Sequence, residues 1–258
     1  MLDLSSVRGF LFDIDGVFYV GKQAISGAAE TLSFLRSRHI PCRFTTNTTT
    51  RSLETMHAEL AAMGLSLNRD EIFTAPHAAV KFLRKEGSPS ICLVLNPNTS
   101  SEFAEFSKDD RHPKYIVVGD IGDGWNYSLM NRLFAMVMDG AILLALHKGR
   151  YWQVAEGLRM DIGAFIAGLE YVTSKAAVVV GKPSESFFRL ALDDLGLLPD
   201  QVVMVGDDLY NDIDGAQRAG LRAILVRTGK FREGITADST VKPDLIIDSI
   251  AELPKLLR

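Results

Sequence analysis

Apolar runs that suit strands alternate, in the first quarter of the chain, with segments whose apolar residues recur at helical spacing. Strand-like runs occupy residues 9–12 and 40–46, and helical patterns occupy residues 27–39 and 53–63. The first run is short and is closed by turn residues, which is typical of a buried strand. This order of strand, helix, strand and helix predicts a parallel sheet that is flanked by helices.

The same two patterns continue to the end of the chain. Further strands are predicted at residues 91–95, 115–119, 142–146, 177–181, 202–206, 223–226 and 245–247, and further helices at residues 127–138 and 187–195. We therefore predict an α/β fold with a Rossmann-like parallel-sheet core, formed by residues 1–77 and 177–258. Residues 78–176 carry strands and helices of their own and are predicted to form an inserted α/β domain.

Composition narrows the class of protein. Of the 258 residues, 47% are hydrophobic and 23% are charged, which is typical of a globular protein in water. The net charge of −4 predicts no general affinity for nucleic acid or for an anionic membrane, and no apolar run approaches the roughly 18 residues of a membrane span. Cys42 and Cys92 lie inside apolar runs and are expected to be free thiols in a reducing compartment. These features predict a cytoplasmic protein.

The tetrad Asp13-Ile14-Asp15-Gly16 directly follows the first predicted strand. In open parallel sheets, ligands bind at the carboxyl ends of the strands, so these two carboxylates are expected at a binding edge. Side chains alternate along extended chain. One carboxylate could therefore attack a substrate or bind a metal while the other takes a different position near the reacting group.

Two further segments at predicted strand ends carry groups that suit a phosphate. Thr46 and Asn47 follow the second strand and can donate hydrogen bonds to phosphate oxygens without adding charge. Lys182, before Pro183 at a predicted helix start, can neutralise phosphoryl charge as a point cation. Each segment alone has a simpler interpretation, as an ordinary turn or as a solvated surface lysine.

A cluster of aspartates follows the predicted strand at residues 202–206. Asp207, Asp208 and Asp212 lie close together in sequence, and their mutual repulsion suggests a compensating cation. Mg²⁺ suits this position because it prefers carboxylate oxygens and water as ligands. Five residues fall at predicted carboxyl ends of strands in one sheet and could converge: Asp13, Asp15, Thr46, Lys182 and Asp207.

In order and content these segments resemble the four motifs of the haloacid dehalogenase superfamily of aspartate-nucleophile phosphohydrolases. The resemblance covers the whole chain and rests on DIDG at 13–16, Thr46-Asn47, Gly181-Lys182-Pro183 and GDDLYND at 206–212. The position of the inserted domain is similar to that in the NagD-like branch, whose members have a large α/β cap. The resemblance thus implies a catalytic core of residues 1–77 and 177–258 and a cap of residues 78–176.

The resemblance also implies roles for the motif residues. Asp13 is expected to attack phosphorus and form an aspartyl-phosphate, and Asp15 to protonate the leaving oxygen and later activate water. The expected Mg²⁺ ligands are Asp13, the main-chain carbonyl of Asp15, and Asp207. The expected phosphate-binding residues are Thr46, Asn47 and Lys182, and the expected supporting residues are Asp208 and Asp212.

Other known motifs fit the sequence less well than this one. A nucleotide-binding P-loop is disfavoured because Ala176 replaces its first glycine and Pro183 replaces its Ser or Thr. A calcium-binding loop is disfavoured because the first tetrad continues into Val17 rather than into oxygen ligands. Retention of Asp15 favours phosphoester hydrolysis over dehalogenation. A phosphotransferase with the same intermediate and a non-enzymatic scaffold both stay open.

The expected partner is a small phosphorylated substrate, and a homodimer through the cap is left open. The cap is expected to act as a lid that shapes the substrate site and supplies none of the reacting groups. Four residues of this domain could face the substrate, although a solvated loop with packed aromatic side chains is the simpler interpretation: Lys148, Arg150, Tyr151 and Trp152. The five histidines, His147 among them, show no metal-ligand spacing and are expected at surface or capping positions.

Overall fold

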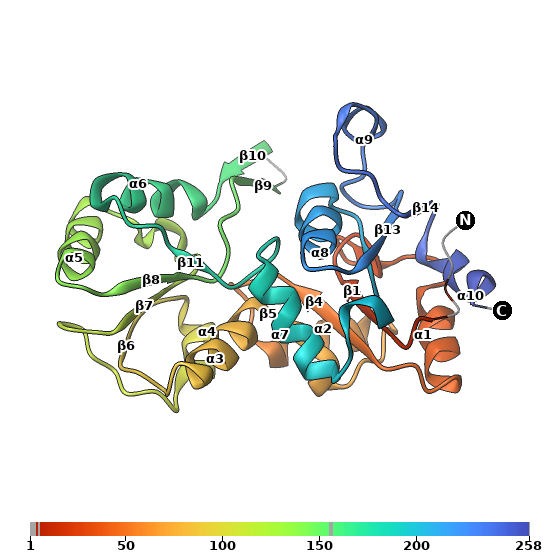
Figure 1. The fold of residues 1–258 in the computed structure, drawn as a ribbon, viewed down its shortest axis with the longest axis horizontal. Helices are drawn as coiled ribbons and strands as arrows, with labels where there is room; N and C mark the ends of the chain where they lie inside the picture. The colour runs from red at the N-terminus through yellow and green to blue at the C-terminus, as the bar shows by residue number, and fades with distance from the viewer. Residues whose placement is uncertain (1–3, 5, 155–156, 258) are drawn as a thin grey trace. The chain divides into compact units, whose positions relative to one another are not determined.

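The computed structural model describes residues 4, 6–154 and 157–257, and the chain divides into two compact units (Figure 1). The core unit comprises Met1–Thr46, Leu53–Phe73 and Lys182–Arg258. The inserted unit comprises Asn47–Ser52 and Thr74–Gly181. Each unit is built around its own sheet. Within the described residues, no helix is both long and apolar enough to cross a membrane.

The sheet of the core unit has six strands in the order β14-β13-β12-β1-β4-β5. Their bounds are β1 Gly9–Asp13, β4 Cys42–Thr46, β5 Ile72–Thr74, β12 Val202–Gly206, β13 Arg222–Val226 and β14 Leu245–Ile247. Strand β1 pairs in parallel with both β12 and β4, and β13 pairs in parallel with β12 and β14. The predicted α/β fold with a Rossmann-like core is therefore confirmed.

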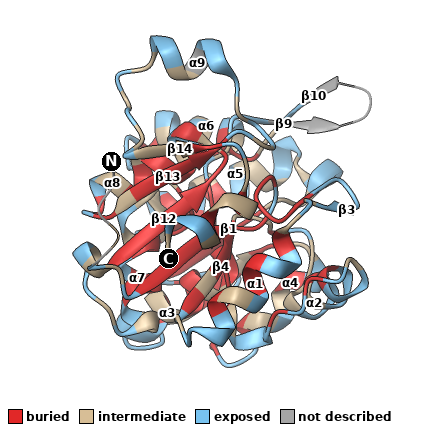
Figure 2. Ribbon diagram, turned by 90° about the vertical axis from the view of Figure 1, so that its right-hand side faces the viewer, coloured by how far each residue is buried: buried red, intermediate tan, exposed pale blue. Residues whose placement is uncertain are grey.

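Helices cover both faces of this sheet, as Figure 2 shows for α1 and α2 on one side and α7 and α8 on the other. The helices are α1 Ala28–Ser37, α2 Leu53–Ala62, α7 Glu185–Leu195, α8 Gly215–Arg218, α9 Glu233–Asp238 and α10 Leu253–Leu256. Short helical turns lie at Arg69–Glu71, Pro199–Gln201, Leu209–Asp214 (η5, a π-helix) and Ile250–Glu252. Strands β2 (Tyr19–Val20) and β3 (Gln23–Ala24) form a hairpin.

Aromatic side chains hold the central strand of the core unit in place. The Phe12 ring stacks on the Phe44 ring at 5.6 Å between centroids and meets the Phe18 ring edge-on at 5.4 Å. All three side chains are buried, and Leu11 is buried on the opposite face because side chains alternate along a strand. Every residue of β1 is buried (Figure 2), so the strand that ends in Asp13 is fixed by packing on both faces.

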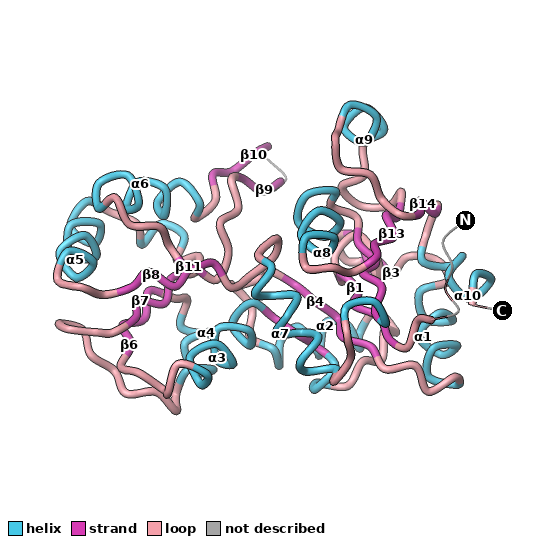
Figure 3. Tube along the Cα trace, in the orientation of Figure 1, coloured by secondary structure: helices cyan, strands magenta, loops and turns pink. Residues whose placement is uncertain are grey.

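The inserted unit has a four-stranded parallel sheet in the order β11-β8-β7-β6 (Figure 3). The strands are β6 Ile91–Val94, β7 Tyr115–Val118, β8 Ile142–Ala145 and β11 Val178–Val179, and the helices are α3 Ala75–Lys85, α4 Pro97–Ser100, α5 Tyr127–Met138 and α6 Gly163–Thr173. Helix α3 packs on one face of the sheet, and α5 and α6 pack on the other. Short helical turns lie at Ser101–Phe103 and Gly122–Gly124.

Three features differ from the sequence prediction. Residues 177–181 were expected to add a strand to the core sheet, but β11 pairs with β8 of the inserted unit, with Val178 opposite Leu144. A short apolar run predicts a strand without indicating which sheet it joins. Strand β5 was not predicted. The stretch that contains Trp152, expected to be a loop, forms the antiparallel pair β9 (Tyr151–Val154) and β10 (Gly157–Met160).

We expect Leu11→Ala to lower the free energy of unfolding by about 2–5 kcal/mol, because it leaves a cavity under the central strand. The matched control is Leu198→Ala in the same unit, whose side chain is 64% exposed and whose loss should cost less than about 0.5 kcal/mol. Urea denaturation followed by circular dichroism measures both. Equal losses in the two variants would contradict the packing described for β1.

Candidate active site

The first carboxylate of the candidate site stands at the carboxyl end of the central strand. Asp13 is the last residue of β1, and its side chain is buried. The chain turns directly after it, where Gly16 has a φ of 85° and its N–H donates to the carbonyl of Tyr19 at 2.8 Å. This left-handed conformation favours glycine. Asp15 is exposed, so the two carboxylates of the tetrad occupy different environments.

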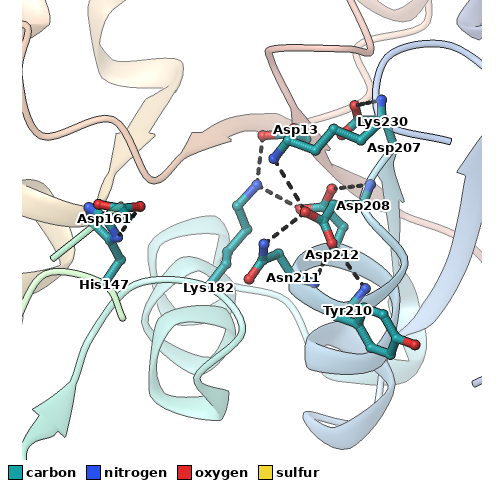
Figure 4. A network of polar contacts seen from close by, with 10 residues as sticks. All are labelled: Asp13, His147, Asp161, Lys182, Asp207, Asp208, Tyr210, Asn211, Asp212 and Lys230. Atoms are coloured by element: carbon teal, nitrogen blue, oxygen red, sulfur yellow. Dashed lines mark hydrogen bonds and ion pairs between the residues drawn. The ribbon is translucent and has the colours of Figure 1, made fainter. Parts of the chain in front are cut away.

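Lys182 links Asp13 to a second buried acid (Figure 4). Its Nζ donates to Asp13 Oδ1 at 2.6 Å and to Asp212 Oδ1 at 2.7 Å. Burial lowers the pKa of Lys182, but the charges of the two aspartates outweigh this effect and the pKa is raised. The side chain therefore stays a cation throughout the neutral range.

Asp207 follows β12, the neighbour of β1 in the sheet, and is also buried. Its Oδ2 accepts a hydrogen bond from the main-chain N–H of Lys230 at 2.7 Å. Its Oδ1 is buried and has no hydrogen-bond partner among the described residues. Burial, together with the charges of Asp13 and Asp212, raises the pKa of Asp207 to about 8.

These acids form a group that can hold a metal ion. Carboxylate oxygens of Asp13, Asp207 and Asp212 all lie within 4.8 Å of one another, and all three residues are buried. Three buried carboxylates repel one another, and an orphaned buried oxygen costs free energy unless a ligand satisfies it. A hard divalent cation such as Mg²⁺ fits both requirements because it prefers carboxylate oxygens. The residues present therefore suit the ion.

The turn after β12 holds Asp208 and Asp212 in separate roles. Asp208 caps the π-helix η5, since its Oδ1 accepts from the N–H groups of Tyr210 at 3.1 Å and Asn211 at 3.0 Å. The Asp208 N–H in turn donates to Asp212 Oδ2 at 3.1 Å. Complete burial raises the pKa of Asp212 to about 7, although the charge of Lys182 acts to lower it.

Glycine at position 206 allows Asp212 to pack against the end of β12. A Cβ at this position would lie 2.3 Å from the Asp212 Cβ.

The remaining predicted residues are placed as follows. Thr46 is buried at the end of β4, the other neighbour of β1, and the register sets Asp13 opposite Thr45. Asn47 belongs to the inserted unit, where a Cβ on Gly181 would lie 2.8 Å from its Oδ1. The core unit thus brings together Asp13, Lys182, Asp207 and Asp212 (Figure 4).

Sequence reasoning missed Lys230. It lies in the loop at residues 228–230 after β13, and its Nζ donates to Asp208 Oδ2 at 3.2 Å. The signal was a Thr-Gly-Lys sequence shortly after a predicted strand, at the sheet edge where the other site residues were expected.

His147 was expected at a surface or capping position, and the surface alternative was wrong. Its side chain is buried in the inserted unit, and its Nδ1 accepts from the N–H of Gly149 at 3.2 Å. Burial lowers the pKa of His147, although the nearby charge of Asp161 acts to raise it. A lone histidine after an apolar run carried no signal of burial, because only the packed fold covers it.

Comparison with known proteins places the chain among phosphatases. The family model described as Haloacid dehalogenase-like hydrolase matches residues 10–107, and a second, described as HAD-hydrolase-like, matches residues 179–253. The chain is 38% identical over 260 residues to phospholysine phosphohistidine inorganic pyrophosphate phosphatase from Rattus norvegicus, covering 98% of this chain and 95% of that protein. It is 37% identical over 228 residues to haloacid dehalogenase-like hydrolase domain-containing protein 2 from Mus musculus, covering 88% and 86%.

Solved structures give the same result. The fold is similar to that of p-nitrophenyl phosphatase from Archaeoglobus fulgidus, with a TM-score of 0.89, 28% identity and coverage of 96% of this chain and 98% of that one. It is also similar to NagD from E. coli K-12, with a TM-score of 0.87, 27% identity and coverage of 95% and 98%.

The pKa of Asp207 leads to a prediction about stability without divalent cations. Because the pKa of Asp207 is raised to about 8 in the folded protein, its carboxyl keeps a proton until the pH approaches that value. An unfolded aspartate loses its proton near pH 3.9. Folding therefore becomes less favourable as the pH rises from this value toward the pKa of the folded protein. Asp207→Asn removes the titration. We therefore expect its free energy of unfolding, relative to wild type in EDTA, to rise by at least about 1 kcal/mol from pH 5 to pH 8.

Urea denaturation at the two pH values measures this difference. The matched control is Asp214→Asn, which removes a carboxylate that pairs with Arg218 at the surface. Its effect should stay smaller than that of Asp207→Asn at pH 8. A difference that does not change between pH 5 and pH 8 would show that burial does not hold the proton on Asp207.

Proposed function

Because this chain belongs to the haloacid dehalogenase-like hydrolase family and is a phosphatase of that family, we propose that it hydrolyses small phosphorylated compounds. The proposed route is an aspartyl-phosphate on Asp13, with Mg²⁺ as cofactor. The single observation that supports the proposal is the contact of Lys182 with both Asp13 and Asp212, beside the unpaired buried oxygen of Asp207. This group supplies a nucleophile, a fixed cation and a ligand set for a metal ion.

In the first step Asp13 attacks phosphorus and the bond to the leaving oxygen breaks. Packing of β1 on both faces holds Asp13 in place, which lowers the cost of orienting the nucleophile. Lys182 is buried beside it and offers its ammonium to the phosphoryl oxygens, whose charge it balances in the transition state. Asp15 donates a proton to the leaving oxygen, and its exposed position gives it access to water for proton exchange.

In the second step water attacks phosphorus of the aspartyl-phosphate. Asp15 has lost its proton in the first step and now accepts one from that water, so one residue serves as acid and then as base. The Asp13 carboxylate is released with inorganic phosphate as the product. Thr46, at the neighbouring strand end, donates to phosphoryl oxygens in both steps, and Asn47 is assigned the same role.

The metal site in this proposal consists of Asp13, Asp207 and the main-chain carbonyl of Asp15. A bound Mg²⁺ would offset the repulsion between the nucleophile and the phosphate. Asp212 stays paired with Lys182 and keeps its ammonium turned toward Asp13. Asp208 holds the turn from which Asp212 projects.

The substrate class is tested best with a panel. One relative is named for phospholysine, phosphohistidine and inorganic pyrophosphate, so the panel includes P–N and P–O–P bonds beside sugar, aryl and alkyl phosphate monoesters. Release of inorganic phosphate with Mg²⁺ and its loss in EDTA is the expected result. If the folded protein turned over none of these compounds with Mg²⁺ present, the proposal would be overturned.

We further propose a cytoplasmic location. A homodimer through the inserted unit stays a prediction.

We expect Asp13→Asn to lower kcat for p-nitrophenyl phosphate at least 1,000-fold, because an amide is a poor nucleophile. The matched control is Asp214→Asn, since residues 212–215 repeat the Asp-x-Asp-Gly pattern of the first tetrad away from the strand end. Its kcat should stay within about twofold of wild type. Steady-state release of p-nitrophenolate measures both variants, and near-normal turnover by Asp13→Asn would disprove the nucleophile assignment.

We expect the effect of Asp15→Asn to depend on the leaving group. p-Nitrophenolate needs no proton to depart, whereas an alkoxide does, so the first step should be slowed roughly 100-fold or more only for an alkyl phosphate. The second step lacks its base with either substrate. Rapid mixing with p-nitrophenyl phosphate should therefore show a burst close to one equivalent of p-nitrophenolate. Equal slowing for both substrates without a burst would contradict the role of Asp15.

A further inference from the structure

We infer that the loop at residues 228–230 is a positioning element that holds the Asp207 carboxylate with Oδ1 directed to the metal ion. This inference rests on the proposed function, because it concerns the ligand set of the proposed Mg²⁺ site. The loop follows β13, which the sequence analysis did not connect with the site. It contains Thr228, Gly229 and Lys230, and each of these residues makes a different contact.

The first contact fixes one oxygen of the carboxylate. The main-chain N–H of Lys230 donates to Asp207 Oδ2 at 2.7 Å. The other oxygen, Oδ1, is buried and has no hydrogen-bond partner among the described residues. A carboxylate that is anchored through one oxygen cannot rotate freely, so its second oxygen keeps one direction. This arrangement presents a metal ligand at little entropic cost.

The second contact is close packing against Asp207 Oδ2 by two glycines. Gly229 has a φ of 60°, and a Cβ on it would lie 2.0 Å from Asp207 Oδ2. Gly16, in the turn after the nucleophile, has a φ of 85°, and a Cβ on it would lie 1.9 Å from the same atom. No side chain fits at either position without moving the carboxylate. The oxygen is therefore confined between two main-chain segments.

The third contact ties the loop to the nucleophile turn. The Thr228 hydroxyl donates to the carbonyl of Gly16. The Lys230 Nζ donates to Asp208 Oδ2 at 3.2 Å, which ties the other end of the loop to the turn after β12. Strands β13, β12 and β1 are consecutive in the sheet, so the loops that leave their carboxyl ends are neighbours. The 228–230 loop thus joins the segments that carry Asp13 and Asp207.

Gly229→Ala tests the role of the close packing. We expect it to raise the Kd for Mg²⁺ at least tenfold, because the added methyl displaces Asp207 Oδ2 and with it the direction of Oδ1. The matched control is Gly196→Ala, which has a similar φ of 68° but no heavy atom within 4 Å of the added Cβ. It carries the same backbone strain without the contact, and its Kd should stay within twofold of wild type. Isothermal titration of the full chain with Mg²⁺, without substrate, measures the Kd.

A second variant avoids backbone strain altogether. Thr228→Val removes the hydroxyl that donates to Gly16 and keeps the shape of the side chain. We expect it to raise the Kd for Mg²⁺ at least threefold. The matched control is Thr236→Val, which removes a hydroxyl that donates to the Arg232 carbonyl in the same unit, and its Kd should not change. Circular dichroism confirms that each variant is folded.

The outcomes separate this inference from the proposed function. If wild type binds no Mg²⁺, the proposed metal site is wrong and the inference fails with it. If wild type binds Mg²⁺ and Gly229→Ala and Thr228→Val bind it equally well, the metal site stands and the positioning role is overturned. Equal weakening by Gly229→Ala and Gly196→Ala, with Thr228→Val unchanged, would assign the effect to backbone strain and would also overturn it.

Discussion

One buried cation among three buried carboxylates governs the structure at the end of the central strand. If all four groups are ionised, Lys182 balances one of the charges on Asp13, Asp207 and Asp212, and two negative charges are left over. The nearby Lys230 ammonium pairs with Asp208. Ions taken out of water are costly unless they are paired and hydrogen-bonded. The pKa values respond to this excess, because burial and mutual repulsion raise that of Asp207 to about 8. A bound divalent cation would balance the two remaining negative charges, so the charge of the site suits the proposed Mg²⁺.

The sheet makes this concentration of charge possible. Strands β1, β12 and β13 are adjacent and parallel, so the segments that follow them meet at one edge although they are far apart in sequence. Packing beneath the edge is apolar and aromatic, and the rings of Phe12, Phe18 and Phe44 all contact one another. That packing holds the strand ends together when carboxylates at them repel one another. The glycines at 16, 206 and 229 then allow the main chain to approach the aspartates closely.

The structure also separates residues that look alike in sequence. Asp208 and Asp212 belong to one motif, yet Asp208 caps the helical turn while Asp212 pairs with Lys182. The tetrad at 212–215 repeats the pattern at 13–16, but it lies in a helical segment, and Asp214 pairs with Arg218 at the surface. Sequence similarity between such segments therefore does not indicate similar chemistry; the preceding strand does.

Local pattern was enough to predict the strands β1, β4, β12 and β13 and the helix at Tyr127–Met138, because burial imposes a period that a single segment reveals. It also predicted that Asp13, Lys182 and Asp207 converge at strand ends, and the structure brings these three residues together, whereas their chemical roles stay a proposal. Pattern could not assign residues 178–179 to a sheet, reveal the burial of His147, or connect the 228–230 loop with Asp207. Those features depend on which distant segments pack together, and packing is a property of the whole fold, whereas periodicity is a property of each segment alone.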